Sequence, residues 1–290
     1  MTAKNDKYLI LGSQGQLGRE FQEVLAKRRM SFVAPAEVDC NITDETQINQ
    51  IIQNTHPDIV VNCAAYNNVD KAEEEKDMAF RINADAVANL ASICRRQNIF
   101  LVHFSSDYVF DGTKGDYYQE NDAPDPLNVY GASKRKGEDH IQQILPDHSL
   151  IFRLSWVFGL GQQNFLYKLS TWVKGVTSLK VSSDEISVPT YTADVVEAVL
   201  LAIAKRLCGL YHLTNTNKCS RYEWAKYYLE KRQTSVELIP VSITTFPSTA
   251  KRPLCSAMSN KKLADELNIV LPTWQNAVDR FIERTNALKT

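Results

Sequence analysis

Residues 8–18 read YLILGSQGQLG, and this stretch decides the fold. Its first four residues are apolar and predict a short buried strand, and an apolar helical pattern begins at Leu17. Three of the chain's eleven glycines stand at this junction, at positions 12, 15 and 18. Glycines at such a junction permit a tight turn and let backbone N–H groups reach a pyrophosphate at the helix N-terminus. The stretch therefore predicts a dinucleotide-binding turn, with an ordinary tight turn as the alternative, since its spacing is G-x-x-G-x-x-G rather than G-x-G-x-x-G.

Length and composition set the limits of this interpretation. The 290 residues are 44% hydrophobic and 23% charged, which allows one large or two modest domains and excludes collagen-like or disordered chains. Lys plus Arg number 33 against 34 for Asp plus Glu, so the formal net charge is -1. No global positive field attracts nucleic acid or an anionic membrane, and we expect neither as a partner. An anionic ligand has to be held by local groups.

Targeting and metal signals are weak. The apolar run from Tyr8 to Leu11 is too short for the core of a signal peptide, and no run reaches the roughly 18 apolar residues of a membrane span. We therefore expect a cytoplasmic protein. The five histidines show no H-x-x-x-H spacing and have no cysteine at ligand distance, so we expect no metal. The sequence leaves a monomer and a homodimer open.

Alternation of short apolar runs with helical patterns extends through the first half of the chain. Further strands are expected at 31–33, 59–61, 99–104 and 150–154, and helices from Leu17, after Thr43, which we expect to cap the helix, and over about 83–96. This rhythm predicts an α/β fold with a doubly wound parallel sheet, the Rossmann arrangement, over residues 1–155. We expect residues 156–290 to form mainly a smaller substrate-binding lobe, with some segments returning to the Rossmann core. Within this part, Ser220 and Glu223 have capping-box spacing and predict a helix start.

Residues 130–134 read YGASK and carry the chemistry. Side chains four apart share a helix face, so the Lys134 ammonium should lie near the Tyr130 phenol and lower its pKa. A phenol tuned in this way acts as an acid or base near neutral pH. Such pairs occur by chance on many helices, but the segment Ser105–Phe110, which contains Ser106 and Asp107, follows directly on the expected strand at 99–104, at the sheet edge where parallel sheets bind ligands. Ser106 is placed to donate to a substrate carbonyl.

With these elements the chain resembles the extended short-chain dehydrogenase/reductase family, and within it the reductases of dTDP-linked 4-keto sugars. The resemblance covers nearly the whole length. Its motifs are 12–18, 61–73 (VNCAAYNNVDKAE), 105–112, 126–131 (PLNVYG), 153–157 (RLSWV), 188–190, 210–213 and 251–253 with Ser256. Each motif alone is unspecific, and only the set points to the family.

The resemblance implies reduction of the 4-keto group of dTDP-4-dehydro-L-rhamnose to dTDP-L-rhamnose, with a dTDP-sugar as substrate and a nicotinamide cofactor. It implies these catalytic residues: Tyr130, Lys134 and Ser106. It implies cofactor contacts from Gly12, Gly15, Gln16, Leu17, Asp39, Cys40, Ala64, Ala65, Tyr66, Tyr130 and Lys134. Expected substrate contacts are Ser106, Asp107 and Trp156, to which we add Arg252 near the nucleotide phosphates as our own extension.

Cofactor preference is predicted from the residues after the expected second strand. An acidic residue there binds the ribose diol of NAD, but this chain has Ala34–Ala36, and Glu37 follows a little later. Arg19 and the basic residues 27–29 are candidates for holding a 2′-phosphate. We therefore expect NADP(H) to be preferred over NAD(H).

Two alternatives stay open. A sugar-nucleotide dehydratase or epimerase would share the glycines and the Tyr130/Lys134 pair, but a dehydratase of this family places an Asp–Glu pair after the strand-end hydroxyl, where this chain has Asp107 and Tyr108. An NADP-binding regulatory subunit without catalysis would not need Ser106, Tyr130 and Lys134 together. Both alternatives are therefore less favoured than the reductase.

Overall fold

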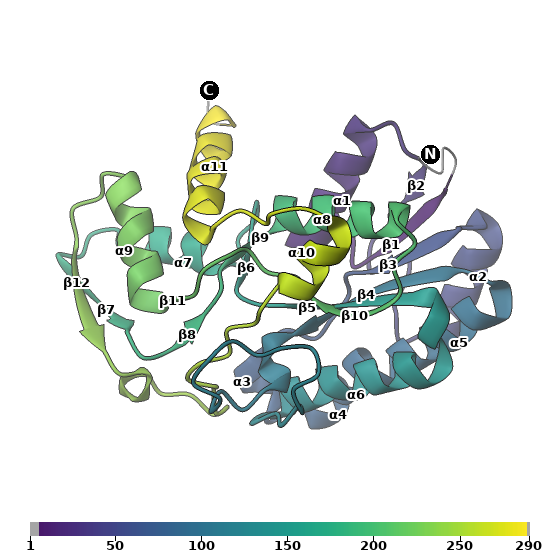
Figure 1. The fold of residues 1–290 in the computed structure, drawn as a ribbon, viewed down its shortest axis with the longest axis horizontal. Helices are drawn as coiled ribbons and strands as arrows, with labels where there is room; N and C mark the ends of the chain where they lie inside the picture. Colours follow the sequence, from purple (N-terminus) through teal and green to yellow (C-terminus); the bar gives the residue numbers. More distant parts are fainter. Residues whose placement is uncertain (1–5, 289–290) are drawn as a thin grey trace.

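A six-stranded sheet forms the centre of the larger lobe in the computed structural model, which describes residues 6–288 (Figure 1). All neighbouring strands are parallel. In spatial order they are β10 (Gly209–His212), β5 (Ser149–Leu154), β4 (Phe100–Ser106), β3 (Ile59–Asn62), β1 (Tyr8–Leu11) and β2 (Phe32–Val33). The chain leaves β1 toward β2 on one side and returns to β3 on the other. The switch point of the sheet, where such folds bind ligands, thus lies between β1 and β3.

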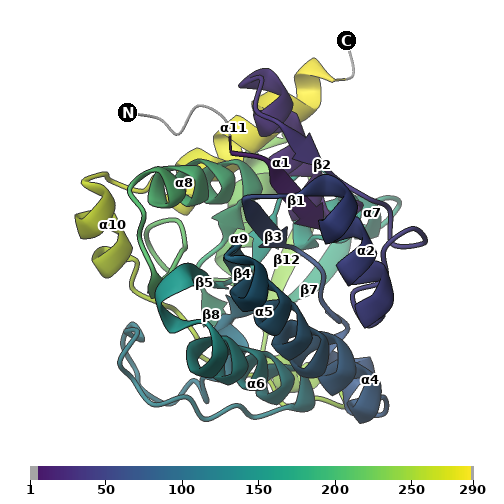
Figure 2. The same ribbon diagram turned by 90° about the vertical axis from the view of Figure 1, so that its right-hand side faces the viewer.

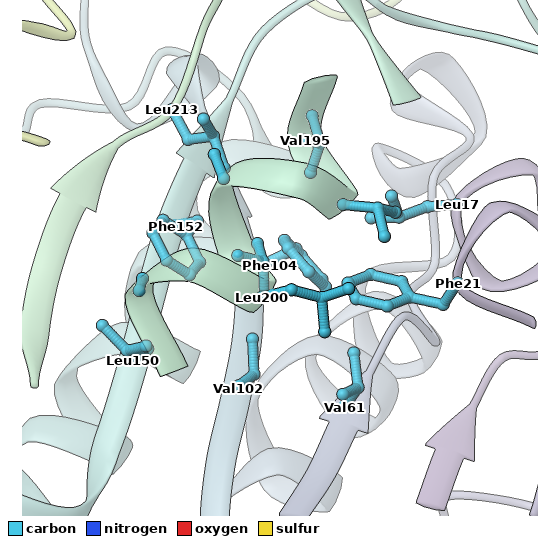
Figure 3. Close-up of a cluster of buried hydrophobic side chains, with 14 of the residues drawn as sticks. Leu17, Phe21, Val61, Val102, Phe104, Leu150, Phe152, Val195, Leu200 and Leu213 are labelled. Atoms are coloured by element: carbon cyan, nitrogen blue, oxygen red, sulfur yellow. The ribbon is translucent and has the colours of Figure 1, made fainter. Parts of the chain in front are cut away.

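The strands are buried on both faces, which explains their continuous apolar runs. In β1, Tyr8 and Ile10 join the core on one face, and Leu9 and Leu11 join the core on the other. Figure 3 shows the first of these cores, where side chains of two helices meet those of three strands. The residues labelled there are Leu17, Phe21, Val61, Val102, Phe104, Leu150, Phe152, Val195, Leu200 and Leu213.

Helices cover the sheet in two layers (Figure 2). One layer contains α1 (Gln16–Lys27), α8 (Thr192–Ala204) and α10 (Lys261–Leu267). The other contains α2 (Glu45–Thr55), α5 (Ala86–Gln97) and α6 (Val129–Ile144). Short helical segments complete this lobe: α3 (Val69–Ala72), α4 (Lys76–Phe80), the π-helical η1 (Arg81–Asp85), and the 3₁₀ turns η2 (Asp107–Val109) and η3 (Pro146–His148). The predicted α/β fold with a doubly wound parallel sheet is confirmed.

A buried ion pair fixes α6 on the sheet. Arg153 of β5 and Glu138 of α6 are 1% and 0% exposed, and their side chains lie 2.6 Å apart. Two nitrogens of one guanidinium edge bind the two carboxylate oxygens, because Arg153 Nε also donates to Glu138 at 2.8 Å. This pairing sets the position of the helix that carries Tyr130 and Lys134.

The smaller lobe is built from two-stranded pieces and three helices. Its strand pairs are β6 (Val157–Phe158) with β9 (Thr190–Tyr191), β7 (Ser178–Ser182) with β12 (Glu237–Val241), and β8 (Ile186–Ser187) with β11 (Cys219–Ser220). The helices are α7 (Phe165–Trp172), α9 (Arg221–Lys231) and α11 (Trp274–Ala287), and η4 (Ile243–Thr245) follows β12. They enclose a separate, tryptophan-rich core. The segments that return to the main sheet after residue 156 are α8, β10 and α10, whereas the boundary at 155/156 stays a prediction.

Two predicted helix starts test the capping argument. Ser220 Oγ accepts from the Glu223 N–H at 3.1 Å and Glu223 accepts from the Ser220 N–H at 2.7 Å, so the predicted capping box is confirmed. The prediction that Thr43 caps α2 is wrong. Asp44 caps it, accepting from the N–H groups of Thr46 and Gln47, because a carboxylate is the stronger acceptor. No helix within residues 6–288 combines the length and the apolar character needed to cross a membrane.

Candidate functional site

A cleft of about 540 Å³ opens at the carboxyl edge of the sheet, between the two lobes. One wall comes from the turn into α1, from the ends of β3, β4 and β5 and from α6, and the other comes from α7 and α9 of the smaller lobe. The predicted site residues that line it are Gly15, Gln16, Leu17, Ala64, Ala65, Ser106, Asp107, Tyr130, Lys134, Trp156 and Arg252. The fold thus brings together residues from six separate stretches of sequence.

The glycine turn presents unpaired backbone donors to this cleft. Gly15 is the N-cap of α1 and no side chain caps the helix, so its first N–H groups are free for an anion. Gly12 has a φ of +69°, and a Cβ added there would lie 2.4 Å from the backbone nitrogen of Ala64. Only glycine therefore fits where the turn meets the end of β3. Nothing comes closer than 3.4 Å to a Cβ added at Gly15.

Two further polar groups around the cleft lack partners within residues 6–288. Gln16 donates to the carbonyl of Val157 at 3.2 Å, but its buried Oε1 has no hydrogen-bond partner there. Ser105 Oγ is likewise buried and unpartnered. An uncapped helix N-terminus beside such unpaired groups fits a dinucleotide, which brings a pyrophosphate, ribose hydroxyls and a carboxamide.

Ser106 and Asp107 end β4 at the floor of the cleft. Ser106 Oγ accepts from the Tyr108 N–H at 3.2 Å and donates to Asp107 Oδ1 at 3.1 Å. Burial raises the pKa of Asp107 to about 6, against the opposing effect of three hydroxyl hydrogen bonds. Asp107 is 3% exposed.

Tyr130 and Lys134 both reach the cleft from the start of α6. Asn128 caps the helix by accepting from the Gly131 N–H at 2.8 Å. Lys134 is 2% exposed, and within the described part of the chain its ammonium has no hydrogen-bond or ion-pair partner. Burial lowers the pKa of Lys134 to about 8, although the nearby Glu138 charge acts in the opposite direction.

The predicted lowering of the Tyr130 pKa by Lys134 is not found. Burial raises the pKa of Tyr130 to about 12, the Asp107 charge adds to this rise, and a hydrogen bond with Ser106 opposes it. The burial cost of a phenolate outweighs the other effects at this position. Tyr130 is therefore a protonated acid at neutral pH.

Trp156 and Arg252, two of the predicted substrate contacts, also line the cleft. Trp156 has a φ of +40°, a strained conformation for a tryptophan, and its ring lies 3.6 Å from Arg221 Cζ and 5.7 Å from the Trp224 ring. Arg221 Cζ is 5.6 Å from the Trp224 ring, which places both neighbours toward the same side of Trp156. Arg252 lines the cleft, but its guanidinium pairs with Asp70 of α3 at 2.6 Å.

Four predicted cofactor residues do not line the cleft: Gly12, Asp39, Cys40 and Tyr66. Cys40 is buried in the core between the sheet and α2, and Asp39 is exposed in the turn before it. The Tyr66 hydroxyl donates to Glu75 at 2.7 Å. Their proposed roles at the cofactor stay predictions.

The basic residues expected to hold a 2′-phosphate are only partly in reach of the glycine turn. Lys27 and Arg28 lie at the far end of α1, where they pair with Glu23 and Glu197. A helix of 12 residues is about 18 Å long, so this end is far from the turn, and the prediction is wrong for residues 27–29. Arg19 remains, exposed in the first turn of α1.

Sequence reasoning missed most of the second wall. Missed residues that line the cleft are Asn62, Asn67, Asn164, Phe165, Lys168, Trp172, Arg221 and Trp224. Those of α7 and α9 carry no local motif, because only the fold of the smaller lobe brings them to the sheet edge. Within residues 6–288 no group of three or more His, Cys, Asp or Glu side chains is placed to hold a metal ion.

Comparisons with known proteins agree on one family. The family model described as RmlD substrate binding domain matches residues 6–287. A spore coat polysaccharide biosynthesis protein, SpsK, of Bacillus subtilis is 35% identical, covering 97% of this chain and 99% of the relative. A dTDP-4-dehydrorhamnose reductase of Aggregatibacter actinomycetemcomitans is 35% identical, covering 94% and 97%. A dTDP-4-keto-6-deoxy-D-glucose reductase of Streptomyces niveus is 32% identical over 76% and 77%.

Solved structures give the same result. The crystal structure of dTDP-4-dehydrorhamnose reductase from Bacillus anthracis in complex with NADP has a TM-score of 0.92 and 34% identity, covering 97% of this chain and 99% of that one. The similarity therefore extends over both lobes and the cleft between them.

Proposed function

This chain belongs to the RmlD substrate binding domain family of NAD(P)-dependent sugar-nucleotide reductases, and from that premise we propose that it reduces the 4-keto group of dTDP-4-dehydro-L-rhamnose to dTDP-L-rhamnose. The observation that carries the proposal is the meeting of Ser106, Tyr130 and Lys134 in the cleft that begins at the uncapped end of α1.

The cofactor fits along the first wall. The free N–H groups of α1 would hold the pyrophosphate, and Gln16 and Lys134 would offer an unpaired acceptor and an unpaired donor to the remaining polar groups. The small side chains of Ala64 and Ala65 leave the backbone after β3 accessible, so that a cofactor can approach it closely. When bound, the reduced nicotinamide supplies the hydride for the sugar C4.

Protein groups supply the proton. Ser106 donates to the carbonyl oxygen and so polarises the C4–O bond. As negative charge develops on that oxygen, Tyr130 gives up its phenolic proton to it, and the bond changes leave an alcohol at C4 and a phenolate at Tyr130. Lys134, which lines the same cleft one helical turn further along α6, returns a proton to that phenolate.

For the cofactor we propose a preference for NADP(H) over NAD(H). Alanine and proline stand where an acidic residue would repel a 2′-phosphate, and Arg19 is exposed and without an ion-pair partner among the described residues. The Bacillus anthracis relative was crystallised in complex with NADP, so a related site accepts the phosphorylated cofactor.

The alternatives are less well supported by the site. Tyr108 follows Asp107 where a dehydratase would need a glutamate, and its hydroxyl is turned toward Glu185, 3.5 Å away. A regulatory subunit without catalysis has no use for an acid, a carbonyl donor and a buried ammonium in one cleft.

The test is an absorbance assay with enzymatically made 4-keto sugar nucleotide and either NADPH or NADH, with the product identified by NMR. We expect loss of nicotinamide absorbance, faster with NADPH, and formation of the rhamnose epimer. Tyr130→Phe should lower kcat about 100-fold or more while it leaves NADPH binding unchanged. Full activity of Tyr130→Phe, or a product with the opposite configuration at C4, would contradict the proposal.

A further inference from the structure

Trp156 keeps its place in the cleft without a hydrogen bond from its side chain. The residue is 8% exposed and lines the cleft, and its buried indole N–H has no hydrogen-bond partner within residues 6–288. Its backbone has a φ of +40°, a conformation that persists only where the surrounding structure imposes it. The packing contacts of the ring therefore set the orientation of the indole.

Arg221, the first residue of α9, makes one of these contacts. Its Cζ lies 3.6 Å from the centre of the Trp156 ring, the separation of a cation stacked on an aromatic face. The Arg221 side chain is 20% exposed, so the contact is largely shielded from water, where the attraction between a cation and a ring is strongest. Arg221 covers one face of the indole, and a sugar ring can stack only on the other.

A buried carboxylate fixes the position of Arg221. Arg221 Nε donates to Glu185 Oε2 at 3.3 Å, and the Arg221 backbone N–H donates to the Glu185 carbonyl at 3.2 Å. Glu185 is 6% exposed, and its other oxygen lies 3.5 Å from the Tyr108 hydroxyl. The pairing of β8 with β11 brings the two residues together, because Glu185 directly precedes β8 and Arg221 directly follows β11. The guanidinium is thus held by the sheet pair on one side and by the ring on the other.

We propose that the pair of Glu185 and Arg221 sets the orientation of Trp156 toward the substrate sugar. This inference rests on the proposed function, in which Trp156 is a substrate contact. Arg221 is then a positioning residue that acts on the sugar through the indole, and Glu185 acts through Arg221. An indole free to turn would let the keto sugar shift against Ser106 and Tyr130, and a displacement of about 1 Å at the reacting atoms slows a reaction up to about 100-fold.

The experiment is a double-mutant cycle on kcat/KM for the 4-keto sugar nucleotide, with Arg221→Met and Trp156→Leu made singly and together. In the wild-type background Arg221→Met should lower kcat/KM about 10-fold, the size of a shielded contact between a cation and an indole. With Trp156→Leu present, the same change should have little further effect, because no ring is left to position. NADPH binding, followed by fluorescence, should be the same in all these proteins.

A second cycle removes both charges of the pair. Arg221→Met alone leaves the buried Glu185 carboxylate without its cation, which destabilises the fold. Glu185→Gln combined with Arg221→Met avoids this cost and should give the same loss in kcat/KM, which again disappears when Trp156→Leu is present.

Arg252→Met is the matched control. Arg252 is also a cleft arginine beside a carboxylate, but its guanidinium pairs with Asp70 of α3, 2.6 Å away. Its effect on kcat/KM should therefore add to that of Trp156→Leu.

The outcomes separate the inference from the proposed function. Arg221 itself lines the cleft, so additive effects of Arg221→Met and Trp156→Leu would show that Arg221 contacts the substrate directly, and would overturn the inference. An unchanged kcat/KM in the variant without both charges would overturn it as well. Failure of the wild type to reduce the 4-keto sugar nucleotide rejects the proposed function, and the inference with it.

Discussion

Replacement of Lys134 by methionine should make the protein more stable and inactive. The ammonium is 2% exposed and its pKa falls from 10.5 to about 8, since burial costs more than the attraction of Glu138 returns. At roughly 1.4 kcal/mol for each pKa unit, the buried charge costs the fold about 3 kcal/mol. Methionine keeps the length and volume without the charge. We expect the free energy of unfolding to rise by up to about 3 kcal/mol at pH 7.

The stability difference between wild type and Lys134→Met should decrease as the pH rises. Because the folded pKa lies below the unfolded value, the cost is fully present below pH 8 and disappears between about pH 8 and 10.5. Urea unfolding of wild type and Lys134→Met should therefore show a difference of about 3 kcal/mol at pH 7 that falls to roughly a quarter of this value at pH 10. Lys136→Met, an exposed lysine on the same helix, is the control and should change little at either pH. A less stable Lys134→Met, or a gain that is equal at both pH values, would refute the reasoning.

Three further predictions concern the turn, the cofactor and the fold. Gly12→Ala combines a φ of +69° with a clash at 2.4 Å, and should lower stability by more than about 2 kcal/mol and weaken NADPH binding, whereas Gly15→Ala stays folded; thermal unfolding with and without NADPH distinguishes them. Arg19→Ala should weaken NADPH but not NADH binding, roughly tenfold, and Arg29→Asn should alter neither; equal losses for both cofactors would exclude a 2′-phosphate contact. Glu138→Gln leaves a buried arginine of β5 unpaired and should cost about 3–5 kcal/mol in urea unfolding, and a cost under 1 kcal/mol would show that the pair is not needed.

Features encoded in short stretches were predictable from the sequence. The strand and glycine turn at residues 8–18 fold as expected, because apolar runs and glycine spacing act on neighbouring residues. The Ser220 capping box is equally local. The prediction of Thr43 as the N-cap of α2 was wrong by one residue. The hydrophobic pattern located the helix start, but it did not distinguish the Thr43 hydroxyl from the Asp44 carboxylate as the capping group.

Features that depend on direction or on distant contacts were not predictable. Assigning residues 27–29 to the 2′-phosphate ignored that α1 runs away from the carboxyl edge of the sheet. Two serines whose hydroxyls donate to the Asp107 carboxylate, Ser187 and Ser256, are 80 and 149 positions further along the chain, and no spacing rule connects them to Asp107. Burial of Tyr130, which reverses the expected direction of its pKa shift, is likewise a property of the assembled cleft.

The opposite shifts of the two α6 groups give the proposed proton transfer a direction. Burial raises the pKa of Tyr130 to about 12 and lowers the pKa of Lys134 to about 8, because it disfavours the charged form of each. Both groups hold their protons at neutral pH, so Tyr130 starts as the acid. Once it has protonated the sugar oxygen, its phenolate binds a proton far more strongly than the neutral amine does. Transfer from Lys134 to Tyr130 is then downhill, and a buried ammonium that costs stability is what makes the acid ready for the next turnover.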